Sequence, residues 1–122
     1  MDLNESAEER QFRAEARRWL QANVPAEPLP SFDTARGFAL HREWEHRLAA
    51  DRWSAVSWPV EYGGRGADYL KWLIFEEEYW RSGAPGRVSQ NGIFLLGPTI
   101  MEVGTEEQKA RGLYAPGEGI IG

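Results

Sequence analysis

The stretch from Trp58 to Gly66, which reads WPVEYGGRG, constrains the fold of this chain more than any other feature. Proline lacks a backbone N–H, and glycine reaches backbone conformations that other residues avoid, so both interrupt regular elements. Because the stretch separates two helix-like segments, its density of turn-forming residues indicates a defined corner between them. We expect Gly63, Gly64 and Gly66 to take positive φ angles while they redirect the chain.

Two amphipathic helices are predicted before the corner. The stretch from Ser6 to Glu9 fits a capping box, and apolar residues then recur at helical spacing until the helix ends before Pro25. Asp33 or Thr34 offers the N-cap of a second helix that continues to about Arg52. The predicted apolar faces comprise Phe12, Ala16, Trp19 and Leu20 in the first helix and Leu40, Trp44 and Leu48 in the second.

A third helix is predicted from Ala67 to about Ser82, directly after the corner. Apolar residues cover most of its circumference, which is typical of a helix that is buried on all sides. A strand over Leu70 to Phe75 is the alternative. Because Glu76 to Glu78 follow without a helix breaker, the helix is favoured.

The last predicted helices lie between residues 93 and 111. Apolar residues at helical spacing are interrupted by Gly97-Pro98, which indicates two short helices or one kinked helix. Gly104 suits a helix C-terminus, and the stretch from Thr105 to Gln108 fits a second capping box. The sequence therefore predicts an all-α, antiparallel domain of about five to six helices over residues 1–111, without a β-domain, followed by an irregular tail over residues 112–122.

Composition excludes several classes of function. The chain of 122 residues has no cysteine, so disulfides, thiolate nucleophiles and cysteine-based zinc sites are excluded. A formal charge of −5 with interleaved acids and bases argues against nucleic-acid binding. No apolar run is long enough for a membrane span or a secretory signal, so we expect no membrane association and a cytoplasmic location.

Aromatic residues are numerous for so short a chain, with six Trp, five Phe and four Tyr. A domain of this size buries about two-thirds of its unfolded surface, so it cannot hide all of this apolar area. We therefore expect an exposed apolar patch, which in a soluble protein marks a partner surface.

The residues by themselves nominate no catalytic group. The run Glu76 to Glu78 does not form a carboxylate pair, because consecutive helical side chains diverge by about 100°, and a solvated or hinge-side face is the expected role. His41 and His46 are five residues apart, which places them on different faces as surface or partly packed side chains and excludes a two-histidine metal pair. The stretch from Gly64 to Tyr69 begins like a dinucleotide fingerprint, but it lacks the third glycine and a preceding strand.

Three motifs in order nevertheless resemble one family. They are the corner at 58–66, Glu76-Glu77 near the end of an apolar helix, and Leu96 to Ile100 leading into Gly104 to Lys109. Over roughly residues 5–111 this order and spacing resemble the N-terminal helical domain of acyl-CoA dehydrogenases.

The resemblance implies a three-part enzyme in which FAD lies between a middle β-domain and a C-terminal helical bundle. A glutamate removes the α-proton of an acyl-CoA while the β-hydride passes to the flavin, and this glutamate lies outside the matching segment. No catalytic or cofactor-binding residue is therefore expected in this chain, which should be inactive and bind no FAD by itself. Because Gly117-Glu118 resembles the opening of the β-domain and the chain ends at Gly122, a truncated or frameshifted reading frame, or a separately expressed fragment, is expected.

The resemblance also implies that this domain forms a wall of the acyl pocket. The segment matching the family's acyl-lining helix supplies five candidate substrate-binding residues, Gln90, Asn91, Gly92, Phe94 and Leu96. Gly92 stands where many members have a larger side chain, which leaves room for a longer or bulkier acyl group. Packing of Phe94 and Leu96 against neighbouring helices remains an open alternative.

Two other functions remain open. The chain could be a non-catalytic helical module that docks on a full-length dehydrogenase, or an acyl-CoA binding protein. The second alternative lacks a basic cluster for the CoA phosphates, because Arg65, Arg81 and Arg87 are scattered. An apolar surface meant for other domains would make the isolated chain marginally stable or self-associating; the residues that suggest such a surface are Leu73, Ile74, Phe75 and Trp80.

Overall fold

The structure is a computed structural model of the chain, and it describes residues 4–87 and 97–109. In chain order its elements are α1 (Ala7–Asn23), α2 (Ala35–Ala50), the short 3-10 helix η1 (Val60–Tyr62), α3 (Tyr69–Arg81), α4 (Gly97–Val103) and α5 (Glu106–Lys109). The described residues form no strand. The prediction of an all-α domain of about five to six helices is confirmed. None of the described helices is both long and apolar enough to cross a membrane.

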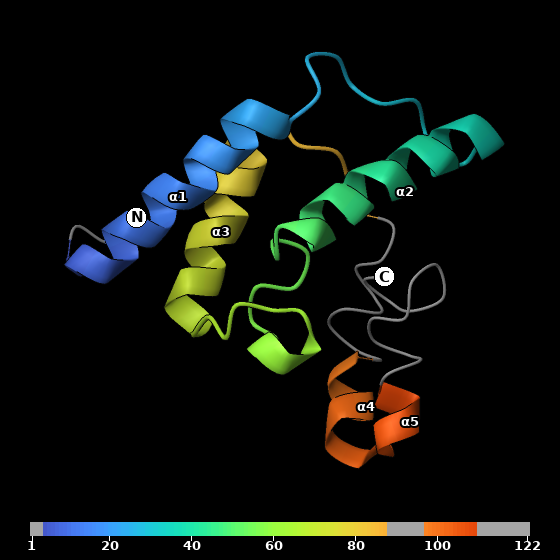
Figure 1. Cartoon of the computed structure of the whole chain (residues 1–122). Helices are drawn as coiled ribbons and strands as arrows, with labels where there is room; N and C mark the ends of the chain where they lie inside the picture. The colour runs from blue at the N-terminus through green and yellow to red at the C-terminus, as the bar shows by residue number, and fades with distance from the viewer. Residues whose placement is uncertain (1–3, 88–96, 110–122) are drawn as a thin grey trace.

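Helices α1, α2 and α3 alternate in direction and form the main body of the domain (Figure 1). Glu8 at the start of α1 pairs with Lys71 at the start of α3, and Arg17 near the end of α1 pairs with Glu78 near the end of α3. These two helices therefore run in the same direction, and α2 runs against both (Figure 1).

The helix ends follow the expected capping chemistry. In the predicted box, the Ser6 hydroxyl accepts from the Glu9 N–H at 3.1 Å, and the Glu9 carboxylate accepts from the Ser6 N–H at 2.8 Å. Thr34, and not Asp33, caps α2, because its hydroxyl accepts from the N–H of Gly37. Both hydrogen bonds of the second predicted capping box, between Thr105 and Gln108, are also present.

The turn that ends α2 places the side chain of Trp53 in the core. Arg52 takes a left-handed conformation with φ of 64°, and the N–H of Trp53 then donates to the carbonyl of Leu48 at 2.8 Å. This six-residue turn is a Schellman motif, here with arginine where glycine is usual. The indole of Trp53 is 1% exposed and stacks on Phe75, with ring centroids 5.3 Å apart.

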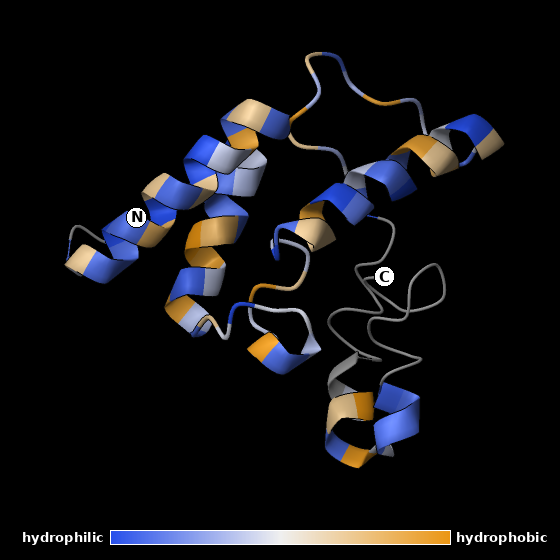
Figure 2. Cartoon of the chain, in the orientation of Figure 1, coloured by the Kyte–Doolittle hydropathy of each residue, from blue (hydrophilic) through white to orange (hydrophobic). Residues whose placement is uncertain are grey.

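The core forms where α1, α2 and α3 meet the segment after α2. Figure 2 shows the apolar residues of these elements as orange bands along mostly polar helices. Trp44 and Leu48 are buried as predicted, but Leu40 is only half-buried, whereas His41 beside it is buried. The main buried cluster comprises Ala16, Leu20, Trp44, Leu48, Trp53, Val56, Phe75 and Tyr79.

The corner holds its shape by two different uses of glycine. Gly63 and Gly66 have φ angles of 94° and 61°, as expected. The expectation of a positive φ at Gly64 is wrong, because the structure needs this glycine for space: a Cβ there would lie 2.0 Å from the carbonyl oxygen of Trp58. The corner is therefore packed tightly against its own buried first residue.

Helices α4 and α5 form a small pair beside the corner (Figure 1). Ile100 and Met101 of α4 pack against Ala55 and Trp58, which are both buried. The turn between the two helices is at Gly104, whose N–H donates to the carbonyl of Ile100 at 2.8 Å, as expected for a helix C-terminus. The corner is thus the platform that positions α4.

Candidate functional site

The predicted acyl-pocket residues lie in a segment outside the described residues. Gln90, Asn91, Gly92, Phe94 and Leu96 therefore remain predictions. The described residues on both sides of this segment are anchored to the body of the domain, by Arg87 before it and by α4 after it. The candidate site is built from these two anchors.

Arg87 is the anchor before the predicted segment. Its side chain is 7% exposed, and Nη1 donates to Oε1 of Glu76 at 2.8 Å. The guanidinium lies 3.8 Å from the centre of the Tyr79 ring, which adds a cation–π contact. Arg87 also lines a pocket of about 170 Å³ together with Glu76, Tyr79, Trp80, Ala84 and Gly86.

Tyr79 connects this anchor to the core. Its hydroxyl accepts from Nε1 of Trp44 at 3.0 Å and donates to the carbonyl oxygen of Pro85. Burial raises the pKa of Tyr79, while the hydrogen bond from Trp44 and the positive charge of Arg87 oppose this rise. The phenol therefore acts as a neutral structural link between α2, α3 and the loop that carries Arg87.

His41 fixes the same loop from the other side. One ring nitrogen lies 3.1 Å from the carbonyl oxygen of Gly86, and the other lies 3.0 Å from that of Pro30. The side chain is 5% exposed, so the expectation of a surface or partly packed residue is wrong for His41, whereas His46 is exposed. The histidine is buried because the loops at Pro30 and Gly86 both fold over it.

The anchor after the predicted segment borders a second pocket. This pocket has a volume of about 620 Å³ and lies on the α4–α5 pair. Its walls combine apolar groups of α4 with the polar capping groups of α5, namely Thr99, Ile100, Val103, Gly104, Thr105, Glu107 and Gln108.

The acidic run of α3 is not the solvated face that the sequence suggested. Glu78 is 2% exposed, and both of its oxygens accept from Arg17, at 2.8 and 2.9 Å. Arg13 adds a third bond to Glu78 at 2.6 Å and a bond to Glu77 at 2.8 Å. The prediction that the three carboxylates point in different directions is confirmed, because the Glu76 carboxylate accepts a hydrogen bond from Arg87, whereas Glu77 and Glu78 bond to Arg13. The run therefore clamps α3 to α1 and to the loop at residue 87.

The charges within this cluster support one another. Hydrogen bonds from Arg17 lower the pKa of Glu78, and those from Arg13 act in the same direction against the opposing effect of burial. Burial lowers the pKa of Arg13, but its hydrogen bonds to Glu5, Glu78 and Glu77 outweigh burial and raise it. Glu78 is therefore engaged as a structural anion, which leaves it unsuited to proton transfer at neutral pH.

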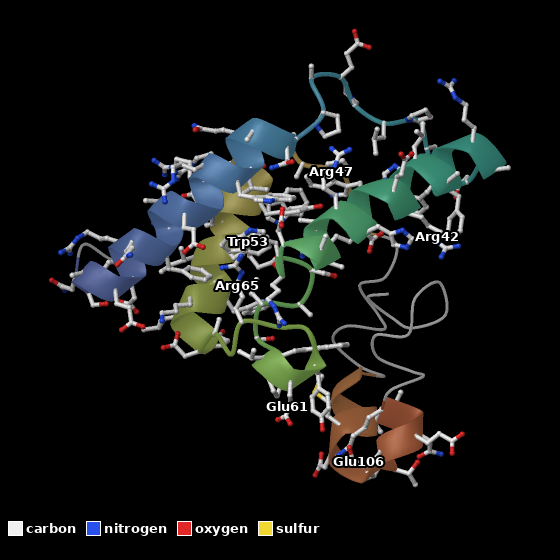
Figure 3. The ribbon with its side chains drawn as sticks, in the orientation of Figure 1. Arg42, Arg47, Trp53, Glu61, Arg65 and Glu106 are labelled. Atoms are coloured by element: carbon white, nitrogen blue, oxygen red, sulfur yellow. The ribbon has the colours of Figure 1, made fainter. Side chains whose placement is uncertain are left out.

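The glycine-rich corner does not offer a phosphate cradle. The N–H groups of Gly64, Arg65 and Gly66 donate to backbone carbonyls at 3.1, 3.2 and 2.8 Å. The Arg65 side chain is also committed, because it lies over the ring of Trp53 at 3.3 Å and donates to the carbonyl of Asp51 (Figure 3). Rejection of a dinucleotide fingerprint here agrees with this geometry.

Metal binding has no support in the described part of the chain. Within residues 4–87 and 97–109, no group of three or more histidine, aspartate or glutamate side chains could hold a metal ion. This part of the domain does hold the anchored side chain of Arg87 and a pocket beside each of the two anchors.

Comparison with known proteins identifies the family. The family model for the N-terminal domain of acyl-CoA dehydrogenases matches residues 6–117. Acyl-CoA dehydrogenase IpdE1 of Mycolicibacterium smegmatis is 40% identical over 114 residues, which cover 85% of this chain and 28% of that protein. The chain thus spans little more than a quarter of this relative's length.

Solved structures give the same result. One chain of the ChsE4–ChsE5 complex from Mycobacterium tuberculosis matches with a TM-score of 0.72 and 32% identity, over 93% of this chain and 28% of that one. The Tcur3481–Tcur3483 steroid ACAD matches with a TM-score of 0.69 and 31% identity, over 93% of this chain and 29% of that one. The chain therefore belongs to the acyl-CoA dehydrogenase family, of which it carries the N-terminal helical domain.

Proposed function

We propose that this chain supplies the N-terminal domain of an FAD-dependent acyl-CoA dehydrogenase, which oxidises the Cα–Cβ bond of an acyl-CoA thioester. The observation that carries this proposal is the coverage of the relatives: 85% of the chain aligns to IpdE1, yet the aligned part is 28% of that protein. The domain contributes a wall of the acyl pocket, and the flavin and the catalytic base belong to the remainder of the enzyme. By itself the chain is inactive and free of flavin.

The acyl-pocket role rests on the two anchors. Arg87 is held by Glu76 and Tyr79, and Ile100 of α4 is packed against the corner. The described residues on both sides of the segment that contains Gln90, Asn91, Gly92, Phe94 and Leu96 are therefore packed against the body of the domain. A pocket wall needs such support, because binding residues act best when a packed scaffold positions them.

The acyl group is proposed to be bulky and of the steroid type. The support is the Tcur3481–Tcur3483 match, whose name identifies that protein as a steroid ACAD. Gly92 adds to this, because the family resemblance implies a larger side chain at this position in many members. The same neighbours are named as pairs of chains, so assembly with a second dehydrogenase chain is part of the proposal.

An uncovered apolar face on α3 is proposed to pack against the rest of the enzyme. Along this face Tyr69, Leu73 and Trp80 follow one another at helical spacing, and Leu70 lies beside them. The exposure of Trp80 reaches 81%. Ile74 and Phe75 are buried, so only part of the apolar helix needs a partner. Four exposed, large apolar side chains on one helix of a small domain indicate an interface.

The isolated chain is accordingly expected to self-associate through this face. The double variant Leu73→Gln/Trp80→Gln should sediment as a monomer at concentrations where the unaltered chain forms dimers or larger species, because it removes apolar area from the interface. Phe38→Gln is the matched control, since Phe38 is 45% exposed on α2 and should leave association unchanged. A monomeric unaltered chain over the whole concentration range would contradict this expectation.

A domain exchange tests the proposed function directly. Residues 6–117 of this chain replace the corresponding domain of the Tcur3481–Tcur3483 steroid ACAD, and flavin absorbance near ~450 nm and dehydrogenation of a steroid acyl-CoA are measured. We expect the chimera to keep flavin and activity, while the isolated chain incubated with FAD shows neither. Flavin bound by the isolated chain would overturn the proposal. An inactive chimera together with binding of the isolated chain to an intact dehydrogenase would instead favour the docking module.

A further inference from the structure

Arg87 has more hydrogen-bonding capacity than its surroundings use. Nη1 is bonded to Glu76, and the guanidinium rests on the ring of Tyr79. Nε and Nη2 are buried and have no hydrogen-bond partner among the residues that the structure describes. Buried N–H groups are nearly always paired, because an unpaired donor loses its bonds to water without replacement. Two unpaired donors on one buried cation therefore point to a missing acceptor.

The two unpaired atoms form one edge of the guanidinium, and the same edge binds carboxylates elsewhere in this domain. Nε and Nη2 of Arg17 donate to the two oxygens of Glu78 at 2.8 and 2.9 Å. Nε and Nη2 of Arg13 donate to the two oxygens of Glu5 at 3.1 and 3.2 Å. This side-on arrangement matches the two parallel N–H groups to a planar carboxylate. Arg87 presents the same donor pair without the acid.

We propose that the Nε–Nη2 edge of Arg87 is a carboxylate-binding site. Arg87 is one of the residues that line the pocket of about 170 Å³, so a hollow lies beside its side chain. The aromatic side chains of Tyr79 and Trp80 form part of the same lining, which suits a carboxylate borne on a flat apolar body. Binding requires the covered edge to open toward this hollow.

The neighbouring Glu76 does not preclude a second acid. Glu76 bonds to Nη1, on the other edge of the guanidinium. Arg13 already holds Glu5, Glu77 and Glu78 at once, so one arginine of this fold accommodates several carboxylates. The carboxylate at Arg87 has two possible sources, a small molecule or an aspartate or glutamate side chain of another polypeptide.

The site is tested on the whole chain by following the Nε–H resonance of Arg87 in ¹⁵N NMR spectra. Sodium benzoate is the probe, and benzamide is its neutral counterpart of the same shape. Benzoate should shift the Arg87 resonance downfield in a saturable manner, and benzamide should not. No saturable shift with benzoate, or an equal response to benzamide, would overturn the proposal. The measurement does not depend on the proposed dehydrogenase function.

A conservative variant tests the geometry of the edge. Arg87→Lys keeps the charge but loses the paired donors, so benzoate affinity, measured as ligand-dependent thermal stabilisation, should fall by about tenfold or more. Arg42→Lys is the control, because Arg42 is exposed on α2 and should leave the affinity unchanged (Figure 3). An equal loss of benzoate affinity in Arg87→Lys and Arg42→Lys would contradict the proposed carboxylate site. Should the Arg87 variant not fold, the NMR titration of the unaltered chain still decides.

The two sources are separated by a third ligand, N-acetyl-aspartate amide, which carries the carboxylate of a protein side chain. Binding of benzoate at least about tenfold tighter than this ligand supports a small-molecule carboxylate that uses the aromatic walls. Equal or tighter binding of the aspartate compound supports a protein side chain as the natural occupant. Failure of both ligands to bind would refute the site.

Discussion

Replacing Gly64 with alanine is expected to lower the free energy of unfolding by about 4 kcal/mol or to prevent folding, an effect at the upper end for a single methyl group. The added Cβ would lie 2.0 Å from the carbonyl oxygen of Trp58 and 2.6 Å from that of Ala55. Both contacts are with backbone atoms of a buried segment, so no side-chain rotation relieves them. Urea unfolding followed by tryptophan fluorescence measures the loss.

Two other glycines supply the controls for Gly64. At Gly83 nothing lies within 4 Å of an added Cβ, but φ is 73°, so alanine there should cost about 1 kcal/mol from backbone strain. At Gly86 an added Cβ would meet, among the described residues, only Phe32, at 3.9 Å, so alanine there should change stability by no more than about 0.5 kcal/mol. Similar losses at Gly64 and Gly83 would show that steric contact at the corner is not the cause.

The parts of the fold that the sequence predicts well depend on local interactions. The capping boxes that begin at Ser6 and Thr105 join residues three positions apart, so the pattern contains all of their chemistry. The positive φ angles of Gly63 and Gly66 follow in the same way from the density of turn residues in the corner. Such features need no knowledge of the packed structure.

The features that the sequence misjudges depend on residues far away along the chain. Glu78 is buried because Arg13 and Arg17 come to it from α1, more than 60 positions earlier. His41 is buried because the loops at Pro30 and Gly86 cover it. A run of acids and an isolated histidine look the same in a sequence whether they face water or distant partners.

The candidate site, too, is predicted only in part from the sequence. The resemblance to acyl-CoA dehydrogenases identifies the family and the general position of the acyl wall, while the five predicted residues of that wall lie outside the described structure. In the sequence Arg87 is one of several scattered bases. Its importance comes from burial against Glu76 and Tyr79, which a single sequence does not reveal. The nearest signal is its place directly after the turn-rich stretch from Gly83 to Gly86.

Glu78→Gln is expected to destabilise the domain by about 2–3 kcal/mol at neutral pH. Removing one partner of a fully buried ion pair costs about 3–5 kcal/mol, and the lower figure applies here because the Arg17 side chain is 45% exposed and partly solvated. The amide keeps the size of the carboxylate but leaves Arg13 and Arg17 without their shared anion. Glu77→Gln is the neighbouring control, with an expected loss below about 1 kcal/mol, because Glu77 is more exposed.

The pH dependence of this loss separates charge from packing. The pKa of Glu78 is lower in the folded chain than its ordinary value of 4.5, so the unfolded chain takes up the proton first as pH falls. The stabilisation by Glu78 is therefore complete above that ordinary value and declines as pH drops through the folded-state pKa. The difference in unfolding free energy between the unaltered chain and Glu78→Gln should thus narrow in acid, as measured by urea unfolding at a series of pH values. A difference that stays constant would mean that the loss does not come from the charge of the carboxylate, and that the clamp between α1 and α3 is not electrostatic.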